Sequence, residues 1–314
     1  MANETGSVSN PRRPNGPRNP ADQWAEGPAG RFWGANGAAG LLAHDPPRGV
    51  LLQHRAAWSD HGSTWGLPGG ARHSNEDPIP GALREATEEA GVPHENLLIT
   101  STYTYDVNYW SYTTVIAEVA TPFEAVINDT ESEELRWVPI DDVDSLPLHP
   151  GLAALWPQLR YALTAQPHLL VDIANVMGSR PDGWWKDRVG AAQRLLTQLE
   201  TLTHHGIPGP FLGHPKEWHF WPEIEAVIEG QVARADNLFT TTPPSEQTTP
   251  STGELLITRA SADGDSTILE RLATFPASTD VTVVTSDRPL RTSAENLGAR
   301  VVGSGSLLSL LPHT

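Results

Sequence analysis

Residues 70–92 of the chain read GARHSNEDPIPGALREATEEAGV, and this stretch carries the clearest structural signal in the sequence. Asp77 can cap the N-terminus of a helix, and Pro78 is suited to the first helical turn. Gly91 is suited to the left-handed residue at which many helices end. These residues therefore predict a helix over roughly residues 78–90.

The predicted helix has two chemically different faces. At about 100° per residue, Glu85, Glu88 and Glu89 fall within about 100° of one another, and the opposite face is apolar. Like charges at this spacing cost about 0.2–0.5 kcal/mol per pair, and the negative end of the helix dipole disfavours Glu88 and Glu89. A merely solvated acidic face is the alternative interpretation, but folding alone would not select this arrangement. A divalent cation removes both penalties, and carboxylate oxygens are the ligands that Mg²⁺ prefers.

The same stretch resembles the signature of the Nudix family, G-x5-E-x7-R-E-U-x-E-E-x-G-U, where U is apolar. The matching residues are Gly70, Glu76, Arg84, Glu85, Ala86, Glu88, Glu89, Gly91 and Val92. The sequence WGLPG at 65–69 resembles the loop that usually precedes this signature. The resemblance covers roughly residues 31–165. It implies an α/β/α sandwich with a mixed sheet, against which the acidic helix packs.

The resemblance also implies a role for each residue of the signature. The implied metal ligands are Glu85, Glu88, Glu89 and the backbone carbonyl of Gly70. Arg84 would orient a carboxylate or a phosphate, and Glu76 would be its paired, supporting carboxylate in the catalytic set. Family members often recruit one more acid from outside the signature; Glu131 is the candidate here, with a solvated loop as the alternative. The implied cofactor is Mg²⁺, with Mn²⁺ as a substitute.

The activity that the resemblance implies is Mg²⁺-dependent hydrolysis of a diphosphate bond in a nucleoside di- or triphosphate derivative. A MutT-type pyrophosphohydrolase acting on (d)NTPs is the first interpretation. Hydrolysis of ADP-ribose or of another nucleoside diphosphate derivative is the second. The third is a nucleotide-sensing regulator that acts through a C-terminal ribonuclease domain. Six aromatic residues could either stack on a base or pack within the sheet: Trp58, Tyr103, Tyr105, Tyr109, Trp110 and Tyr112.

The length of the chain predicts two domains, and its composition predicts an N-terminal tail. Residues 1–30 are rich in Pro, Gly and Asn and are expected to be disordered, so that structure begins near Arg31. The first domain is expected over 31–165. The second is expected over 166–314, where strands alternate with helices as in a Rossmann-like parallel sheet, and residues 240–253 are expected to form a low-complexity loop.

The individual elements are predicted from the spacing of apolar residues and from turn-forming residues. In the first domain, strands are expected at 37–43, 49–55, 97–107, 112–119 and 135–140, with a closing helix at 151–164. In the second, strands are expected at 168–176, 223–230, 255–260, 280–287 and 299–305, and helices at 187–205, 265–275 and 289–297.

The second domain resembles, more loosely, the PIN/NYN-like nuclease domains, which hold Mg²⁺ with a few acids around a Rossmann-like sheet. The candidate residues lie on or just past predicted strands: Asp172, Asn175, Asp263, Asp265 and Asp287. The carboxyl edge of a parallel sheet is where open α/β folds place their sites, so these side chains could converge. Helix capping is the alternative role for Asp265 and Asp287.

The composition limits the partners. The net charge is −17, so extended nucleic acid is a poor partner, and RNA is considered only for the C-terminal domain. A small nucleotide substrate that arrives with Mg²⁺ meets no such obstacle. The chain has no cysteine, which excludes disulfides, thiolate metal sites and a cysteine nucleophile. No apolar run approaches the roughly 20 residues that span a membrane, so we expect a cytoplasmic protein without a membrane partner. The sequence does not define the oligomeric state.

Overall fold

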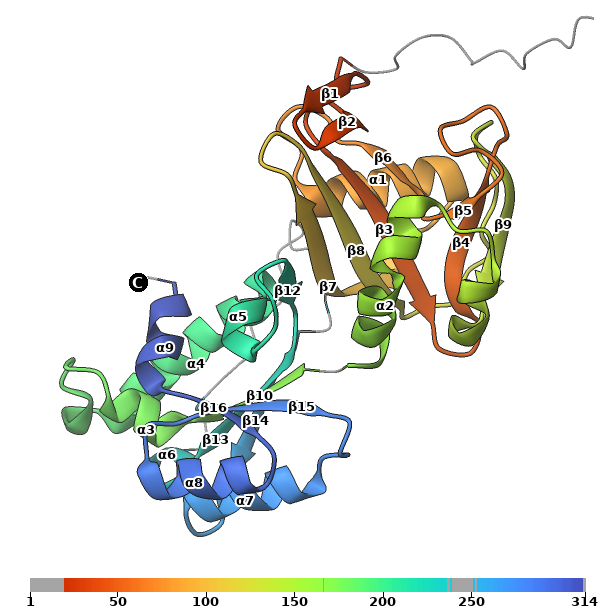
Figure 1. Ribbon diagram of the computed structural model, residues 1–314. Helices are drawn as coiled ribbons and strands as arrows, with labels where there is room; N and C mark the ends of the chain where they lie inside the picture. The colour runs from red at the N-terminus through yellow and green to blue at the C-terminus, as the bar shows by residue number, and fades with distance from the viewer. Residues whose placement is uncertain (1–19, 166, 236–237, 239–250, 252, 313–314) are drawn as a thin grey trace, which may run out of the picture. The chain divides into compact units, whose positions relative to one another are not determined.

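The computed structural model of the chain describes residues 20–165, 167–235, 238, 251 and 253–312 (Figure 1). The chain divides into two compact units, one formed by Met1–Leu97 with Thr104–Leu159 and the other by Leu98–Tyr103 with Arg160–Thr314.

The elements up to the end of the second long helix are β1 (Trp24–Gly27), β2 (Gly30–Trp33), β3 (Ala38–Asp45), β4 (Gly49–Arg55), β5 (Trp65–Gly66), β6 (Gly69–Ala71), α1 (Pro78–Ala90), η1 (His94–Asn96), β7 (Leu97–Asp106), β8 (Ser111–Val119), β9 (Ser132–Val138), η2 (Ile140–Ser145) and α2 (Pro150–Thr164).

The elements that follow are β10 (Pro167–Asp172), α3 (Ile173–Gly178), η3 (Trp184–Lys186), α4 (Arg188–His205), β11 (Ile207–Pro208), α5 (Gly209–Leu212), β12 (Trp218–Phe220), β13 (Glu223–Ile228), α6 (Gly230–Ala233), β14 (Leu255–Arg259), α7 (Gly264–Thr274), β15 (Asp280–Val284), α8 (Arg288–Asn296), β16 (Arg300–Val302) and α9 (Ser304–Leu310).

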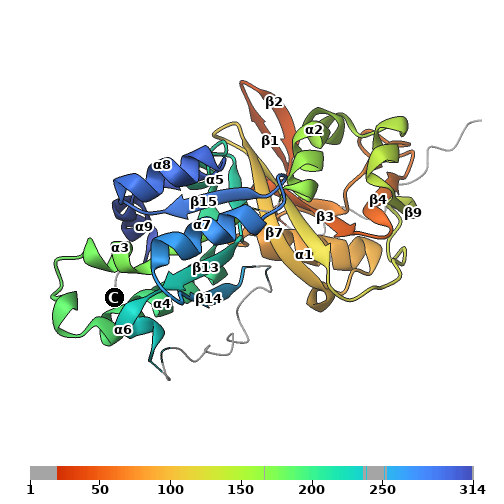
Figure 2. The same cartoon turned by 90° about the horizontal axis from the view of Figure 1, so that it is seen from below.

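The first unit is built on a mixed sheet in the order β8-β3-β4-β5. Strand β3 pairs in parallel with β8 and antiparallel with β4 and β6, and β4 pairs antiparallel with β5 and β9. Both β3 and β4 are apolar runs that are buried over most of their length, as expected for strands covered on two faces. Helices α1 and α2 lie on opposite faces of this sheet (Figures 1 and 2). The expected α/β/α arrangement with a mixed sheet is thus confirmed, and α1 packs against β3.

Strand β7 contributes to both units. Its residues Leu98–Tyr103 belong to the second unit, and the rest of the strand belongs to the first. In the second unit Ser101–Tyr103 pairs antiparallel with β12, and β12 pairs in turn with β11. Strands β11 and β12 were not expected, because both are short and neither shows an alternating apolar pattern.

The second unit contains a fully parallel five-stranded sheet in the order β14-β13-β10-β15-β16. When these five strands are numbered by their sequence order, the order in the sheet is 3-2-1-4-5. The switch point, at which the strand order reverses, lies between β10 and β15. Helices α7 and α8 cover one face through a core that includes Leu170, Val283, Ile268 and Leu290, and α4 lies on the other side (Figure 1). The expected parallel sheet is present, so the carboxyl ends of β10, β13, β14 and β15 share one edge.

Several expected boundaries were wrong. The strand expected at 168–176 ends at Asp172, and the residues after it form helix α3. The strand expected at 299–305 is confined to β16, and α9 begins at Ser304. In both places a strand passes directly into a helix, and apolar composition does not distinguish the two conformations.

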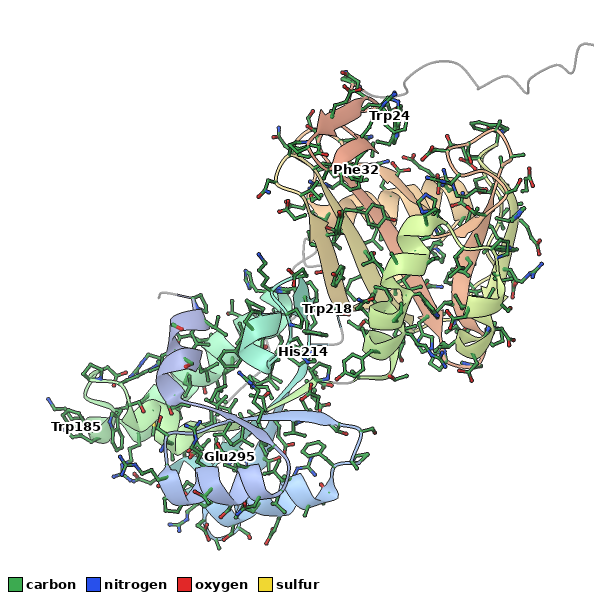
Figure 3. The ribbon with its side chains drawn as sticks, in the orientation of Figure 1. Trp24, Phe32, Trp185, His214, Trp218 and Glu295 are labelled. Atoms are coloured by element: carbon green, nitrogen blue, oxygen red, sulfur yellow. The ribbon has the colours of Figure 1, made fainter. Side chains whose placement is uncertain are left out.

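Regular structure in the N-terminal region begins at an earlier residue than expected. Residues 1–19 lie outside the described residues. Strand β1 lies within residues 1–30, the stretch that was expected to be disordered, and it pairs antiparallel with β2, which begins at Gly30. Trp24 contacts Trp33 edge to face at 5.2 Å between ring centroids, and Phe32 stacks on Trp110 at 4.3 Å. Trp24 and Phe32 are labelled on this hairpin in Figure 3. These aromatic contacts order a segment whose Pro and Gly content alone predicts disorder.

No helix in the described part of the chain is both long and apolar enough to cross a membrane. Most of the low-complexity loop expected at 240–253, namely residues 240–250 and 252, lies outside the described residues.

Candidate active site

Helix α1 fixes the position of the acidic face. It begins after Asp77, whose side chain makes no capping hydrogen bond, contrary to expectation. It ends at Gly91, which has a left-handed φ of 62° as the sequence predicts. Ala82, Ala86 and Ala90 are fully buried. These small side chains let the helix lie close to β3, which directs the glutamates toward the loop that contains β6.

Arg84 connects the carboxylates around this helix. Its Nε and Nη2 donate to Glu76 Oε1 and Oε2 at 2.8 and 2.9 Å, a bidentate pair, and its Nη1 donates to Glu85 Oε1 at 2.7 Å. Nη2 also donates to the carbonyl of Ala71 at 3.1 Å. The hydrogen bonds from Arg84 hold the pKa of Glu76 near 2, well below its usual range. Glu76 is therefore a permanent anion that fixes Arg84, and Arg84 in turn orients Glu85.

Glu85 lies in a confined position against the loop that precedes the helix. A Cβ atom at Gly70 would lie 2.7 Å from Glu85 Oε2, so a larger residue at this position would displace the Glu85 carboxylate. Burial raises the pKa of Glu85 to about 7, and the hydrogen bond from Arg84 opposes part of this rise. The carboxyl group is thus desolvated and held next to the backbone of Gly70.

Glu89 is the most deeply buried acid of the helix. Its residue is only 6% exposed, and its Oε2 accepts a hydrogen bond from the backbone N–H of Gly69 at 3.0 Å. Burial raises the pKa of Glu89 well above its usual value, and the charges of Glu85, Asp129 and Glu131 raise it further. One carboxylate oxygen from each of Glu89, Asp129 and Glu131 lies within 4.8 Å of the other two.

Asp129 belongs to this cluster although the sequence did not single it out. Its Oδ1 accepts hydrogen bonds from the N–H of Glu131 at 3.1 Å and from Ser132 Oγ at 3.3 Å. Its Oδ2 is buried and has no hydrogen-bond partner within the described part of the structure. The only signal in the sequence was its place two residues before Glu131 in the same acidic loop. A buried acceptor without a donor, next to two further carboxylates, fits a hard divalent cation such as Mg²⁺.

The structure therefore separates the three glutamates of the helix. Glu85 and Glu89 point inward, and Glu131 approaches Glu89 as the sequence suggested. The side chain of Glu88 is 50% exposed, and its nearest charged partner is Arg84 Nη1 at 3.6 Å. Glu88 thus lies at the rim of the acidic cluster.

Most of the aromatic residues considered for base stacking have structural contacts. Tyr109 Oη donates to the carbonyl of Gly30 at 2.8 Å, and Trp110 Nε1 donates to that of Trp33 at 2.9 Å, so both hold the β1–β2 hairpin. Tyr103 packs edge to face on Trp218 at 5.0 Å. Tyr112 is half-buried. Burial raises the pKa of Tyr112, the charge of Arg55 opposes part of this rise, and the charges of Glu89 and Glu85 add to it, so its hydroxyl lies near the acidic cluster. Tyr105 is 42% exposed and Trp58 is half-buried.

The second unit gathers its candidate residues at the switch point of the parallel sheet. Asp172 caps α3 by accepting from the N–H of Asn175 at 3.0 Å, and its Oδ2 accepts from Thr285 Oγ1 at 3.0 Å. Burial raises the pKa of Asp172 to about 6. Asn175 Oδ1 accepts from the N–H of Ser286 at 2.8 Å and from Ser304 Oγ at 2.7 Å. Asn175 therefore ties together the loops of this edge.

The remaining acids of this edge lie within electrostatic range of one another. Burial raises the pKa of Asp265, and the charges of Asp287, Asp263 and Glu229 raise it further. Asp287 caps α8, as one alternative predicted, whereas Asp263 rather than Asp265 caps α7. Glu229 accepts from the N–H of Gly264 at 2.7 Å and was missed by the sequence reasoning, since it follows its strand without a distinguishing motif.

Only two groups of acidic or histidine side chains within the described ranges bring three ligand atoms within 4.8 Å of one another. One is Glu89, Asp129 and Glu131, and the other is Asp60, His61 and His149. The acids of the second unit are more widely spaced.

The chain matches the NUDIX domain over residues 35–159. A Mycobacterium tuberculosis protein, whose name describes it as an 8-oxo-dGTP diphosphatase, is 48% identical over 161 residues, which are 48% of this chain and 74% of that protein. A Bifidobacterium longum protein named as a nucleoside triphosphate pyrophosphatase/Nudix hydrolase fusion is 45% identical over 148 residues, 44% of this chain and 31% of that protein. The crystal structure of a Nudix hydrolase from M. smegmatis, RenU, is 50% identical, covers 45% of this chain and 94% of that one, and has a TM-score of 0.42.

Proposed function

The chain belongs to the Nudix family and is a pyrophosphohydrolase, and we propose that it releases pyrophosphate from nucleoside triphosphates with Mg²⁺ as its metal. Among these substrates we place oxidised purine nucleotides such as 8-oxo-dGTP first, because the Mycobacterium tuberculosis relative carries that activity in its name. The observation that carries the proposal is the buried carboxylate cluster around Glu89.

The donor set at this cluster is suited to a hard divalent cation. Glu85, Glu89, Asp129 and Glu131 offer oxygen ligands only, and Gly70 lies against the Glu85 carboxylate, so its carbonyl is a further proposed ligand. A bound Mg²⁺ would supply positive charge that offsets these carboxylates and the phosphates of the substrate.

The residues around the metal ligands have positioning roles. Glu76 holds the guanidinium of Arg84 in a bidentate pair, and Arg84 holds Glu85 through a third N–H. The N–H of Gly69 fixes the orientation of Glu89. These hydrogen bonds keep the carboxylates in place before substrate binds, so that little reorganisation is needed during the reaction.

The first test is a substrate panel with Mg²⁺, comprising canonical and oxidised (d)NTPs, ADP-ribose and dinucleoside polyphosphates. We expect pyrophosphate from triphosphates, and we expect Glu89→Gln to lower kcat by about two orders of magnitude or more. Glu95→Gln, which changes an acid with a 70% exposed side chain in η1, is the matched control and should retain activity. Faster turnover of ADP-ribose would favour the second interpretation. Tight nucleotide binding without any product would favour a sensor.

For the second unit we propose a PIN/NYN-like metal-dependent ribonuclease as a further candidate function. The supporting observation is the approach of Asp172, Asp265 and Asp287, with Glu229, at the switch point of a parallel sheet. The test is cleavage of single-stranded and structured RNA with Mg²⁺ or Mn²⁺. Loss of cleavage in Asp172→Asn, with the thermal unfolding of the protein unchanged, would support the proposal. Absence of cleavage by the intact chain would contradict it.

A further inference from the structure

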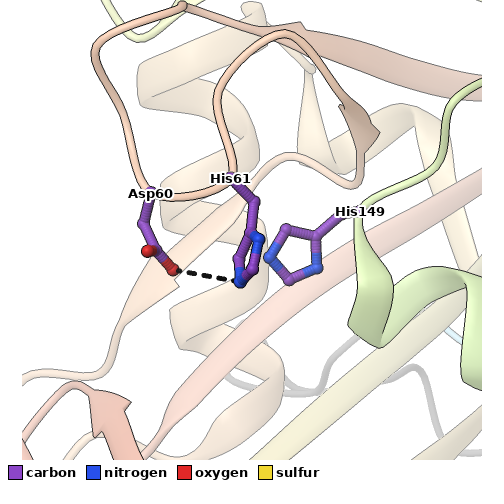
Figure 4. Close-up of side chains that lie close together, drawn as sticks. All are labelled: Asp60, His61 and His149. Atoms are coloured by element: carbon purple, nitrogen blue, oxygen red, sulfur yellow. Dashed lines mark ion pairs between the residues drawn. The ribbon is translucent and has the colours of Figure 1, made fainter.

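A second group of metal-binding side chains lies outside the acidic cluster. Asp60 and His61 come from the loop between β4 and β5, and His149 comes from the segment just before α2 (Figure 4). One ligand atom of each lies within 4.8 Å of the others. The two imidazole rings meet edge to face at 4.8 Å, and Asp60 Oδ2 lies 3.9 Å from His61 Nε2. We propose that these three side chains form a second metal site that binds a transition-metal ion such as Zn²⁺ or Co²⁺.

The backbone holds the three donors together although His149 is far from the other two in the sequence. The N–H of Trp65 donates to the carbonyl of Pro147 at 2.8 Å, and the N–H of His149 donates to that of Trp65 at 2.7 Å. On the other side, Arg55 Nε donates to the carbonyl of Asp60 at 3.1 Å. Both ligand segments are therefore anchored to β5 or to the end of β4. A site assembled in this way loses little conformational entropy when an ion binds.

The backbone at His61 supports the same interpretation. His61 has a φ of 50°, in the left-handed region that residues other than glycine rarely adopt. Its carbonyl accepts a hydrogen bond from Thr64 Oγ1 at 2.6 Å, which stabilises this conformation. The conformation places the His61 ring beside His149 rather than away from it.

The ring of His149 makes one hydrogen bond to the backbone. Its Nδ1 accepts from the N–H of Gly151 at 3.1 Å. If Nε2 binds the ion, the ring proton lies on Nδ1, which then can no longer accept the hydrogen bond from Gly151. Water can replace this contact, because it is exposed.

The surrounding charges determine which ion the site prefers. Asp60 contributes one carboxylate, and the guanidinium of Arg55 lies within electrostatic range of His149. This single negative charge, opposed by Arg55, gives little attraction for Mg²⁺, which depends on anionic oxygen ligands. Imidazole nitrogens bind Zn²⁺, Co²⁺ and related ions much more strongly. The two clusters of the first unit should therefore differ in selectivity, with Mg²⁺ at the carboxylates and a nitrogen-binding ion at the histidines.

The two sites are neighbours without sharing a ligand. Arg55 lies within electrostatic range of both His149 and Tyr112, and Tyr112 lies within range of Glu85 and Glu89. Arg55 therefore interacts electrostatically with both groups, although they share no ligand. The proposal does not depend on the identity of the nucleotide, since it is tested by metal binding itself.

The test uses the full chain, freed of metal with a chelator and then kept in excess Mg²⁺ so that the carboxylates are saturated. Co²⁺ is titrated, and binding is followed by calorimetry and by the visible absorption of nitrogen-ligated Co²⁺. We expect saturable binding of one ion, weakened by about tenfold or more in His61→Ala, His149→Ala and Asp60→Asn. Glu89→Gln should keep this binding, which separates it from the acidic cluster. His94→Ala, a change of another exposed histidine, is the matched control and should leave the affinity unchanged.

Two results would overturn the proposal. One is the absence of saturable Co²⁺ binding in excess Mg²⁺, and the other is an unchanged affinity in both histidine variants. Circular dichroism establishes that each variant is folded. If His149→Ala is unfolded, His149→Gln tests the same ligand with a side chain of similar volume.

Discussion

Replacing Glu85 by glutamine should stabilise the metal-free protein at pH 8 while it removes hydrolase activity. The carboxyl group of Glu85 is only 15% exposed, and burial raises its pKa from 4.5 to about 7. Burying the charged form without a metal costs free energy. Glutamine has nearly the same shape, carries no charge and can still accept a hydrogen bond from Arg84 Nη1.

The magnitude follows from the two pKa values. Because the pKa in the folded state lies above that in the unfolded state, the contribution of Glu85 to stability is fully present below pH 4.5. It is lost as the pH rises through the folded-state value of about 7. The difference between about 7 and 4.5 corresponds to roughly 3 kcal/mol at pH 8. At pH 5 the same calculation gives less than about 1 kcal/mol.

The assay is urea-induced unfolding in EDTA at pH 5 and pH 8, followed by circular dichroism. We expect Glu85→Gln to unfold at a higher urea concentration than the wild type at pH 8, with a much smaller difference at pH 5. Adding Mg²⁺ at pH 8 should stabilise the wild type more than the variant, because the cation neutralises the buried carboxylate. Glu95→Gln is the control at an exposed position.

Two results would refute this reasoning. The first is a Glu85→Gln variant that is no more stable than the wild type at pH 8 without metal. The second is a stability difference that is the same at both pH values, since a pH-independent effect would arise from packing rather than from the buried charge.

Three further predictions concern other parts of the chain. Arg84→Lys removes the bidentate pair with Glu76, so kcat should fall by about tenfold or more while the thermal unfolding temperature changes little; an unaltered kcat would show that the pair is not needed for positioning. Arg271→Met leaves Glu225, whose side chain is 1% exposed, without its bidentate partner, and should reduce the free energy of unfolding by about 3–5 kcal/mol in urea titrations. Adding Glu225→Gln should restore much of that loss, and no recovery would contradict the assigned cause. Phe32→Ala removes the ring stacked on the β7–β8 turn and should make the β1–β2 hairpin cleavable in limited proteolysis, whereas unchanged resistance would show that other contacts order it.

Local patterns predicted the elements that position the site. Helix α1 occupies the expected residues 78–90, because Pro78, Gly91 and the alanine face act within a few residues of one another. Strand β4 begins at Gly49 and ends at Arg55 as expected. The parallel sheet of the second unit also follows from the sequence, since β-branched runs alternate there with helices.

The sequence was less informative where a residue acts through a distant partner. Asp129 joins Glu89 only because the loop before β9 folds back on the C-terminal end of α1, where the N–H of Asn128 donates to the carbonyl of Glu89 at 3.1 Å. Glu229 joins the acids of the second unit only because β13 lies beside β10 in the sheet. Neither residue has a spacing that marks it out along the chain.

The helix from 78 to 90 and its acidic face, which is unfavourable without a cation, follow from the sequence alone, because helical periodicity and terminal residues are local properties. Which acids face inward depends on the tertiary structure. It buried Glu85 and Glu89, left Glu88 at the rim, and added Asp129 to the cluster. It also brought His149 to Asp60 and His61. The physical reason is that convergence depends on strand pairing and on the return of loops to the sheet, which are interactions between residues far apart in the chain.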